Sequence, residues 1–143
     1  MNRNKRIQLA LIFLLIFNAP LSAKELIKMK SISFIESSNN PTAFNSISKA
    51  RGLYQITPIC LLEYNNFHKV KYSQKDLFNA KINYKIAFWY LNTRIPQMLK
   101  HFGKEITVRN TLISYNAGIS YVVKNKKLPS ETENYIRRYE KIP

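Results

Sequence analysis

The chain has 143 residues, of which 45% are hydrophobic and 22% charged, and this composition fits one globular domain. Its 23 lysines and arginines against 8 acidic residues give a formal net charge of +15, and so few carboxylates argue against an acidic metal cage. A single cysteine excludes an intramolecular disulfide, and three glycines leave no phosphate-binding loop, so nucleotide-binding classes are disfavoured.

The N-terminal segment has the pattern of a secretory signal peptide. Basic residues precede an apolar run over residues 7–17, and the small residue Ala23 follows. This run is shorter than the roughly 20 residues that span a bilayer, but it has the length of a signal-peptide core. We predict a signal peptide over residues 1–23 and an exported domain over 24–143, located in the periplasm or cell envelope. An uncleaved N-terminal anchor is the alternative.

The first part of the exported domain predicts two helices. An apolar pattern over residues 24–35 predicts a helix that is buried on much of its girth, and Pro41 with its polar neighbours should follow its end. Thr57 and Pro58 form the pattern of a helix cap followed by a first helical residue. They open a helix that should run to about Asn65.

The second part of the domain predicts three more helices. Ser73 and Asp76 form a capping-box pattern, which predicts the start of a central core helix that Pro96 should end or kink. Residues 107–115 predict another helix, and a second capping box over residues 130–133 predicts a terminal one. Because no stretch alternates as a strand does, the expected fold class is mainly helical.

No metal or cofactor site is expected. His68 and His101 lie far apart in the sequence and lack the H-E-x-x-H pattern of a zinc site. Cys60 lies in an apolar helical stretch, which predicts a buried, unreactive thiol.

Glu36 is the candidate for acid–base chemistry. It lies at the carboxyl end of the first helix, where the helix dipole disfavours a carboxylate by a few tenths to about 1 kcal/mol. In a cleft with apolar or aromatic walls, burial would raise its pKa further. A carboxyl that stays protonated near neutral pH is what a general acid requires. By residue type alone, a solvated glutamate at a helix end is the simpler interpretation.

Four short motifs change that balance. In chain order they are Glu36-Ser37 with Asn40-Pro41, then Gly52-Leu53-Tyr54-Gln55, then Tyr115-Asn116-Ala117-Gly118, then Pro129-Ser130-Glu131-Thr132 with Tyr135. Together they strongly resemble the soluble lytic transglycosylase (SLT) family, lysozyme-like enzymes that cut bacterial peptidoglycan. The resemblance covers about residues 26–139. It implies a fold similar to goose-type lysozyme, peptidoglycan glycan strands as substrate, and no cofactor.

The resemblance implies a role for each matching residue around the reacting bond. Glu36 would be the sole catalytic acid and base, and Ser37 would lie near the N-acetyl group of the substrate. Tyr115 would place its hydroxyl close to the catalytic carboxyl. From residue chemistry alone, Tyr115 could also be a core residue.

Further matching residues would contact sugar or shape the site. Gln55 would hydrogen-bond sugar, Asn116 would contact sugar or shape the cleft, and Glu131 would orient the site. Tyr54, where the family usually has methionine, would line a sugar subsite. Considered by chemistry alone, Gln55 and Asn116 could also satisfy loop backbone, and the helix dipole explains Glu131.

The implied reaction is non-hydrolytic. Glu36 would protonate the β-1,4 glycosidic oxygen between N-acetylmuramic acid and N-acetylglucosamine, and then accept the proton of the C6 hydroxyl as a 1,6-anhydro ring closes. Ordinary glycosidases use two carboxylates, and this chain has few acidic residues. Three alternatives remain: a hydrolytic lysozyme on the same fold, a catalytically idle wall-binding module, and nucleic-acid binding, which the export signal disfavours.

The size of the domain resembles that of single-domain transglycosylases that open the wall for secretion or conjugation machinery. A general recycling enzyme or a phage-derived one fits equally well. The strongly basic charge would suit the carboxylates of peptidoglycan.

Overall fold

The computed structural model describes residues 27–143. The predicted signal peptide over residues 1–23 lies outside this part. In chain order the helical elements are α2 (Met29–Ser37), α3 (Pro58–His68), the 3-10 turn η1 (Asp76–Phe78), α4 (Ala80–Trp89), the π-helix η2 (Tyr90–Arg94), α5 (Ile95–His101), α6 (Val108–Asn116), α7 (Ser120–Val123) and α8 (Ser130–Lys141).

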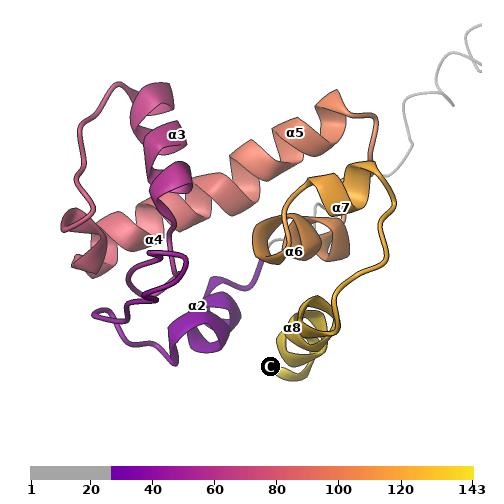
Figure 1. The fold of residues 1–143 in the computed structure, drawn as a ribbon, viewed down its shortest axis with the longest axis horizontal. Helices are drawn as coiled ribbons and strands as arrows, with labels where there is room; N and C mark the ends of the chain where they lie inside the picture. Colours follow the sequence, from indigo (N-terminus) through magenta and orange to yellow (C-terminus); the bar gives the residue numbers. More distant parts are fainter. Residues whose placement is uncertain (1–26) are drawn as a thin grey trace, which may run out of the picture.

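The described residues form helices and loops around one long central rod (Figure 1). The only β pairing among them consists of isolated bridges, which join Phe44 with Arg51 and Arg51 with Ile56. The prediction of a mainly helical fold is therefore confirmed. Within residues 27–143, no helix is long and apolar enough to cross a membrane.

The central rod consists of α4, η2 and α5, which follow one another without a break. Its start differs from the prediction. The Asp76 carboxylate accepts hydrogen bonds from Ser73 as a capping box would, but these bonds close a turn before η1. Asn79 then adopts an extended conformation, and its side chain caps α4 by accepting from the N–H groups of Lys81 and Ile82. The core helix α4 thus begins after the Asn79 cap and not at the turn that Ser73 and Asp76 form.

Pro96 does not end this rod. A proline lacks an N–H and clashes with the carbonyl four residues before it, so it normally interrupts an α-helix. Here the turn that precedes it, Tyr90–Arg94, is a π-helix, in which hydrogen bonds reach five residues back. The wider turn carries the helical path past the proline, which lies in the first turn of α5.

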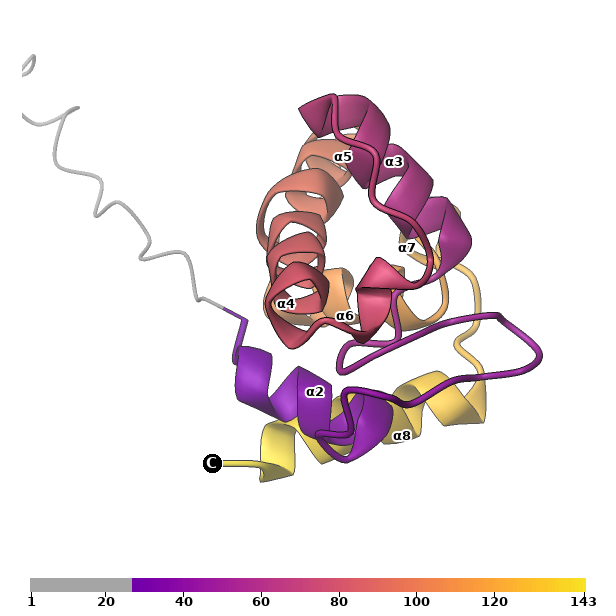
Figure 2. The same cartoon turned by 90° about the vertical axis from the view of Figure 1, so that its left-hand side faces the viewer.

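Helix α2 begins later than predicted and includes Glu36 in its last turn. Ser31, Ile32 and Ser33 are buried on successive sides of the helix, and only Lys30 and Phe34 are exposed, so α2 is buried on much of its girth, as expected. Figure 2 shows α2 lying beside α8, and the two helices pack against each other. The packing of α2 on α8 brings together residues from the two ends of the domain.

The other predicted helix starts are mostly confirmed. Thr57 caps α3 by accepting from the N–H of Cys60, and Thr107 caps α6 in the same way. Helix α3 continues past the predicted Asn65 to His68. The second predicted capping box does not form. Helix α8 starts at Ser130, as predicted, but no side chain caps it. Its Glu133 pairs instead with Arg109 of α6, at 3.1 Å.

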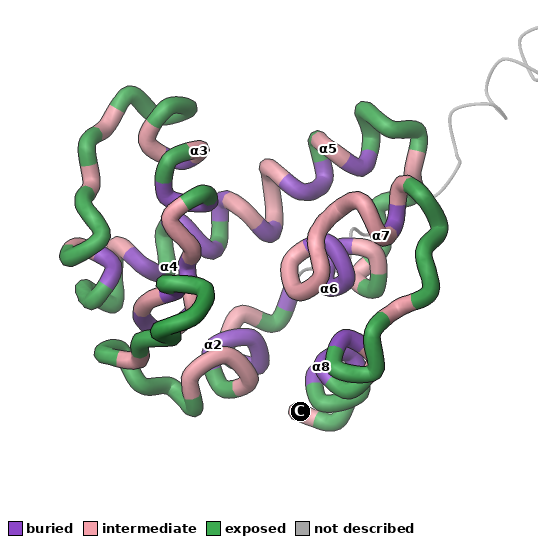
Figure 3. The backbone as a smooth tube through the Cα atoms, viewed as in Figure 1, coloured by how far each residue is buried: buried purple, intermediate pink, exposed green. Residues whose placement is uncertain are grey.

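The hydrophobic core lies along the rod and the inner sides of the helices around it (Figure 3). The long loop between α2 and α3 is fixed to this core by one buried side chain, Asn83 of α4. Its amide group accepts from the N–H of Tyr54 at 2.9 Å and donates to the carbonyls of Arg51 and Leu77 at 2.8 Å. Gly52 has a φ of +78°, and a Cβ there would lie 2.3 Å from the Asn83 amide. The loop therefore has a defined position over α4.

Candidate active site

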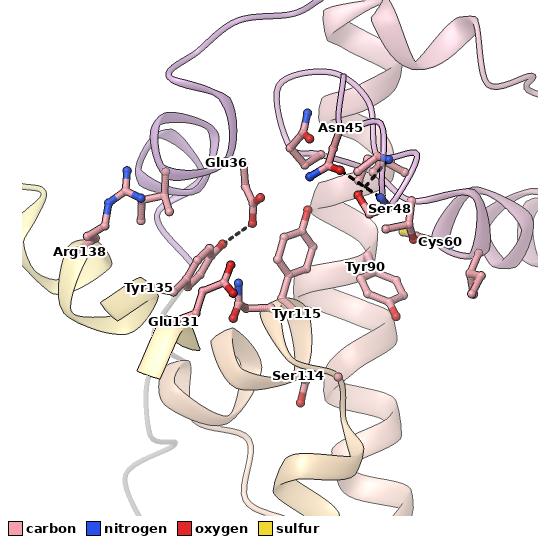
Figure 4. Close-up of a pocket in the computed structure, with 18 of the residues that line it drawn as sticks. Glu36, Asn45, Ser48, Cys60, Tyr90, Ser114, Tyr115, Glu131, Tyr135 and Arg138 are labelled. Atoms are coloured by element: carbon pink, nitrogen blue, oxygen red, sulfur yellow. Dashed lines mark hydrogen bonds between the residues drawn. The ribbon is translucent and has the colours of Figure 1, made fainter. Parts of the chain in front are cut away.

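A cleft of about 800 Å³ lies where α2, the α2–α3 loop, α3, α6 and α8 meet. Figure 4 shows most of its lining residues. The lining residues are Ile35, Glu36, Asn45, Ser48, Ala50, Gln55, Ile56, Thr57, Ile59, Cys60, Tyr90, Ser114, Tyr115, Asn116, Gly118, Ser130, Glu131, Asn134, Tyr135 and Arg138.

Glu36 projects into this cleft from the last turn of α2. The hydroxyl of Tyr135, on α8, donates a hydrogen bond of 2.8 Å to its Oε1 atom (Figure 4). Burial raises the pKa of Glu36 to about 7, against the opposing effects of the Tyr135 hydrogen bond and the positive charge of Arg138. Near neutral pH this carboxyl is therefore partly protonated, and it can both donate and accept a proton.

Two more ionisable groups of α8 act on Glu36. The negative charge of Glu131 raises the pKa of Glu36, whereas the positive charge of Arg138 lowers it. Both residues line the cleft, Glu131 in the first turn of the helix and Arg138 two turns later. Burial, followed by the charge of Glu36, raises the pKa of Tyr135 well above its usual range, so Tyr135 stays a hydrogen-bond donor.

Tyr115 lines the cleft but does not hydrogen-bond Glu36. Its hydroxyl donates to the carbonyl oxygen of Tyr54, at 2.6 Å. The charge of Glu36 contributes to raising the pKa of Tyr115, after burial, so the two groups share one environment. The tyrosine that bonds the carboxyl is Tyr135, whereas Tyr115 joins the end of α6 to the α2–α3 loop.

Gln55 lines the cleft from the loop that Asn83 holds. Its backbone lies in the left-handed region, with φ +48°, and its Nε2 atom donates to the carbonyl of Gly52 at 3.0 Å. The same Nε2 atom donates to the carbonyl of Ala43 at 3.4 Å. The side-chain amide therefore satisfies loop backbone, and its Oε1 atom remains as the acceptor that a ligand in the cleft could use.

Asn116 is the last residue of α6, Glu131 lies in the first turn of α8, and both line the cleft. The Oδ1 atom of Asn116 accepts from the hydroxyl of Thr132, at 2.8 Å. Thr132 is buried, so this bond ties the end of α6 to the first turn of α8. The bond fixes the position from which Glu131 faces the cleft.

Ser37 and Tyr54 are not among the residues that line the cleft. The Ser37 hydroxyl lies 2.8 Å from the carbonyl oxygen of Leu53, which links the end of α2 to the loop. The Tyr54 side chain is 4% exposed and packs against Tyr84. Ser37 therefore contacts the loop backbone, and Tyr54 packs in the core next to the cleft.

Tyr135 belongs to the candidate site but is not among the site residues predicted from the sequence. A signal was present, because Tyr135 closes the last of the four motifs, three residues after Thr132. Asn45, Ser48 and Asn134 also line the cleft, and nothing in their local sequence pointed to this position. Their place depends on how the loop and α8 pack in three dimensions.

Among the described residues, no group of three or more histidine, cysteine, aspartate or glutamate side chains could hold a metal ion. Cys60 is buried, as predicted, although one side of it borders the cleft. Burial raises the pKa of its thiol, with a smaller contribution from the charge of Glu63, so the thiolate is strongly disfavoured. The acid–base groups of the cleft are therefore carboxyl and phenol groups.

The cleft thus combines one half-buried carboxyl near its ionisation point with tyrosine hydroxyls and side-chain amides. Among known protein families, the model described as Transglycosylase SLT domain matches residues 22–137. No curated protein and no solved structure matched the chain.

Proposed function

The chain belongs to the transglycosylase SLT domain family, and from this premise we propose that it is a lytic transglycosylase with Glu36 as its single catalytic acid and base. The proposed reaction cleaves the β-1,4 bond between N-acetylmuramic acid and N-acetylglucosamine without consuming water. The observation that carries the proposal is the position of Glu36 in the cleft, with a pKa of about 7 caused first by burial.

The proposed reaction has two proton transfers. In the first, protonated Glu36 gives its proton to the glycosidic oxygen while the C1–O bond of the muramic sugar breaks and the N-acetyl oxygen of the substrate stabilises the sugar cation. In the second, the C6 hydroxyl bonds to C1, and its proton passes to the Glu36 carboxylate. The enzyme returns to its starting state, and the muramic sugar ends in a 1,6-anhydro ring.

The raised pKa supports both steps, because a group that titrates near neutral pH serves well as acid and then as base. The Tyr135 hydroxyl, 2.8 Å from Oε1, supports a fixed orientation of the carboxyl and stabilises its ionised form between the two transfers. Gln55 and Asn116, which line the same cleft, would bind the hydroxyl and acetamido groups of the sugars.

Hydrolysis on the same scaffold is the second candidate, because a second carboxylate, Glu131, lines the same cleft. An inverting or retaining glycosidase uses such a pair. Glu131 is exposed and lies in the first turn of α8. A role in holding negative charge near Glu36, and so keeping Glu36 protonated, accounts for it without a second catalytic group.

A peptidoglycan substrate indicates action at the cell envelope, and we propose export through the signal peptide over residues 1–23. The proposed biological setting is local opening of the wall for secretion or conjugation machinery. The basic surface would favour binding to the carboxylates of peptidoglycan, and this binding should weaken as salt is added.

The test compares the purified protein with its Glu36→Gln variant on isolated peptidoglycan, with released sugars identified by mass spectrometry. Fragments with 1,6-anhydro ends that are lost in the variant are the expected result. Reducing ends would make water the acceptor and would move the assignment to hydrolysis, with Glu131→Gln as the next variant. Binding without any release, in the wild type, would contradict the proposal and favour an idle wall-binding module.

A further inference from the structure

Two tyrosines of α8 each make a hydrogen bond to α2. The Tyr135 hydroxyl donates to Oε1 of Glu36 at 2.8 Å, and the Tyr139 hydroxyl accepts from the N–H of Lys28, also at 2.8 Å. The two tyrosines are four residues apart, so they lie on one face of α8, and both are buried. Lys28 is the N-cap of α2, and Glu36 lies in its last turn. The second bond therefore holds the opposite end of the helix that carries the candidate acid.

Lys28 holds the carboxyl end of α8 in a second way. Its Nζ atom donates to the carbonyl of Ile142, the residue that follows α8, at 2.8 Å, and lies 5.7 Å from the centre of the Tyr139 ring. Figure 2 shows the start of α2 near the C-terminal end of the chain. Because the bond to Tyr139 has a main-chain donor at the N-cap, it fixes the end of α2 itself and not one flexible side chain.

The start of α8 is attached to a different helix. Thr132 and Glu133 bond to Asn116 and Arg109 of α6, at 2.8 and 3.1 Å. Tyr135 lies between this attachment and the one to α2 at the far end of α8. With the α6 attachment alone, α8 would be free to pivot about its first turn and to carry the Tyr135 hydroxyl away from the carboxyl. The bond at the far end opposes this pivot.

We propose that Tyr139 is a positioning residue: by accepting from the Lys28 N–H it keeps α8 docked on α2, so that the Tyr135 hydroxyl stays within reach of the Glu36 carboxyl. The inference rests on the proposed function, for which it names a residue that aligns the acid. Tyr139 is not among the residues that line the cleft, so it acts through the position of α8 and not on the sugar.

The position of α8 governs the surroundings of Glu36. The ionisable groups that share its environment are Tyr135, Glu131 and Arg138 of α8 and Tyr115 of α6. Burial is the largest cause of the raised pKa of Glu36. When α8 moves off, water reaches the carboxyl, and the loss of burial outweighs the loss of the hydrogen bond. The pKa of Glu36 therefore falls when the Tyr139 bond is lost, whereas it rises when only the Tyr135 hydroxyl is removed.

The experiment removes the Lys28–Tyr139 hydrogen bond from each side in turn. Tyr139→Phe removes the acceptor and keeps the ring, and Lys28→Pro removes the donor at a residue whose φ of −72° suits proline. Lys28→Ala is the matched control for the second variant, because it removes the Nζ contact but keeps the N–H. Thr107→Ala is the control for a general loss of stability, because Thr107 caps α6 and does not line the cleft.

The pKa of Glu36 is measured by carboxyl carbon NMR, in which the Glu36→Gln variant identifies the signal. In Tyr139→Phe and Lys28→Pro this pKa should lie on the order of one pH unit below that of the wild type, and sugar release should slow on the order of tenfold. The double variant should change no further than either single variant, because both remove the same bond. Lys28→Ala should lie closer to the wild type, and Thr107→Ala should match it.

A Glu36 pKa that stays at its wild-type value in Tyr139→Phe, or that rises as expected for Tyr135→Phe, would overturn the positioning role. A fall of the same size in Thr107→Ala, or additive changes in the double variant, would overturn it as well. Because the NMR titration needs no cleavage, its outcome is independent of the sugar-release test. If the wild-type protein releases no sugar but the pKa falls in both variants, the proposed reaction fails and the positioning role remains.

Discussion

The hydroxyl of Tyr135 donates a hydrogen bond of 2.8 Å to Oε1 of Glu36, although 99 residues separate the two in the sequence. The bond crosses from α8 to α2, the first and last long helices of the described part. This hydrogen bond lowers the pKa of Glu36, but burial of the same carboxyl raises the pKa by a larger amount. The ionisation of Glu36 therefore depends directly on how α8 docks.

Replacing Tyr135 by phenylalanine should raise the pKa of Glu36 above about 7, because the hydrogen bond that favours the carboxylate is lost. Glycan cleavage requires protonated Glu36 first, so kcat/KM should fall as pH rises through this pKa, and the variant's alkaline limb should lie at higher pH. Its kcat should fall on the order of tenfold, because the carboxyl loses its fixed orientation. A pH–rate profile of released sugars measures both effects.

Tyr121→Phe is the matched control for this change, because Tyr121 is half-buried but does not line the cleft. It should leave the pH–rate profile where it is in the wild type. An alkaline limb that stays in place in Tyr135→Phe would show that the hydrogen bond does not control the acid.

Glu36→Gln should stabilise the fold above neutral pH. The folded pKa of about 7 exceeds the ordinary value of 4.5, so the folded state binds more protons than the unfolded state between these values. The wild type therefore loses stability as pH rises from 4.5 to 7. Glutamine removes this loss. After a discount for partial exposure, the free energy of unfolding at pH 8 should rise by roughly 1–2 kcal/mol relative to the wild type.

Urea unfolding at pH 4.5 and pH 8 measures this effect. The difference between Glu36→Gln and the wild type should grow with pH. A difference that is the same at both pH values would contradict the raised pKa of Glu36.

Gly52→Ala should destabilise the protein by about 2–4 kcal/mol. The new Cβ would lie 2.3 Å from both the Asn83 Nδ2 atom and the Leu77 carbonyl oxygen, and the backbone has a φ of +78°. Gly103→Ala is the control, since its φ is +64° but no atom lies within 4 Å of the added Cβ. It should cost only the conformational penalty, about 1 kcal/mol.

Denaturant unfolding of both glycine variants separates backbone strain from steric conflict. Equal costs for the two substitutions would mean that the close approach of Asn83 and Leu77 to Gly52 imposes no steric penalty on an added Cβ.

Thr57→Ala should reduce stability by about 1 kcal/mol, because the Thr57 side chain caps α3 through the N–H of Cys60. Ser130→Ala, at the start of α8, should be neutral within about 0.5 kcal/mol, because no side chain caps that helix. Thermal unfolding of the two variants compares a capping pattern that forms with one that does not. A destabilised Ser130→Ala would indicate a cap that the structure lacks.

The sequence by itself determined most of the local structure. Thr57 and Thr107 mark helix starts because the oxygen of such a side chain can accept from an N–H three residues on, whatever the rest of the chain does. The local rules failed where two signals compete. Asn79 lies closer than Ser73 to the apolar stretch and caps α4, and a π-helix carries the rod past Pro96.

The sequence also identified Glu36, Gln55, Tyr115, Asn116 and Glu131, and all five line the cleft. It could not determine which hydroxyl reaches the carboxyl, nor that Ser37 and Tyr54 do not line the cleft, because both depend on contacts between distant segments. The pKa of Glu36 is such a property. Its largest cause is burial, which exists only once α2, the loop and α8 have packed around the carboxyl.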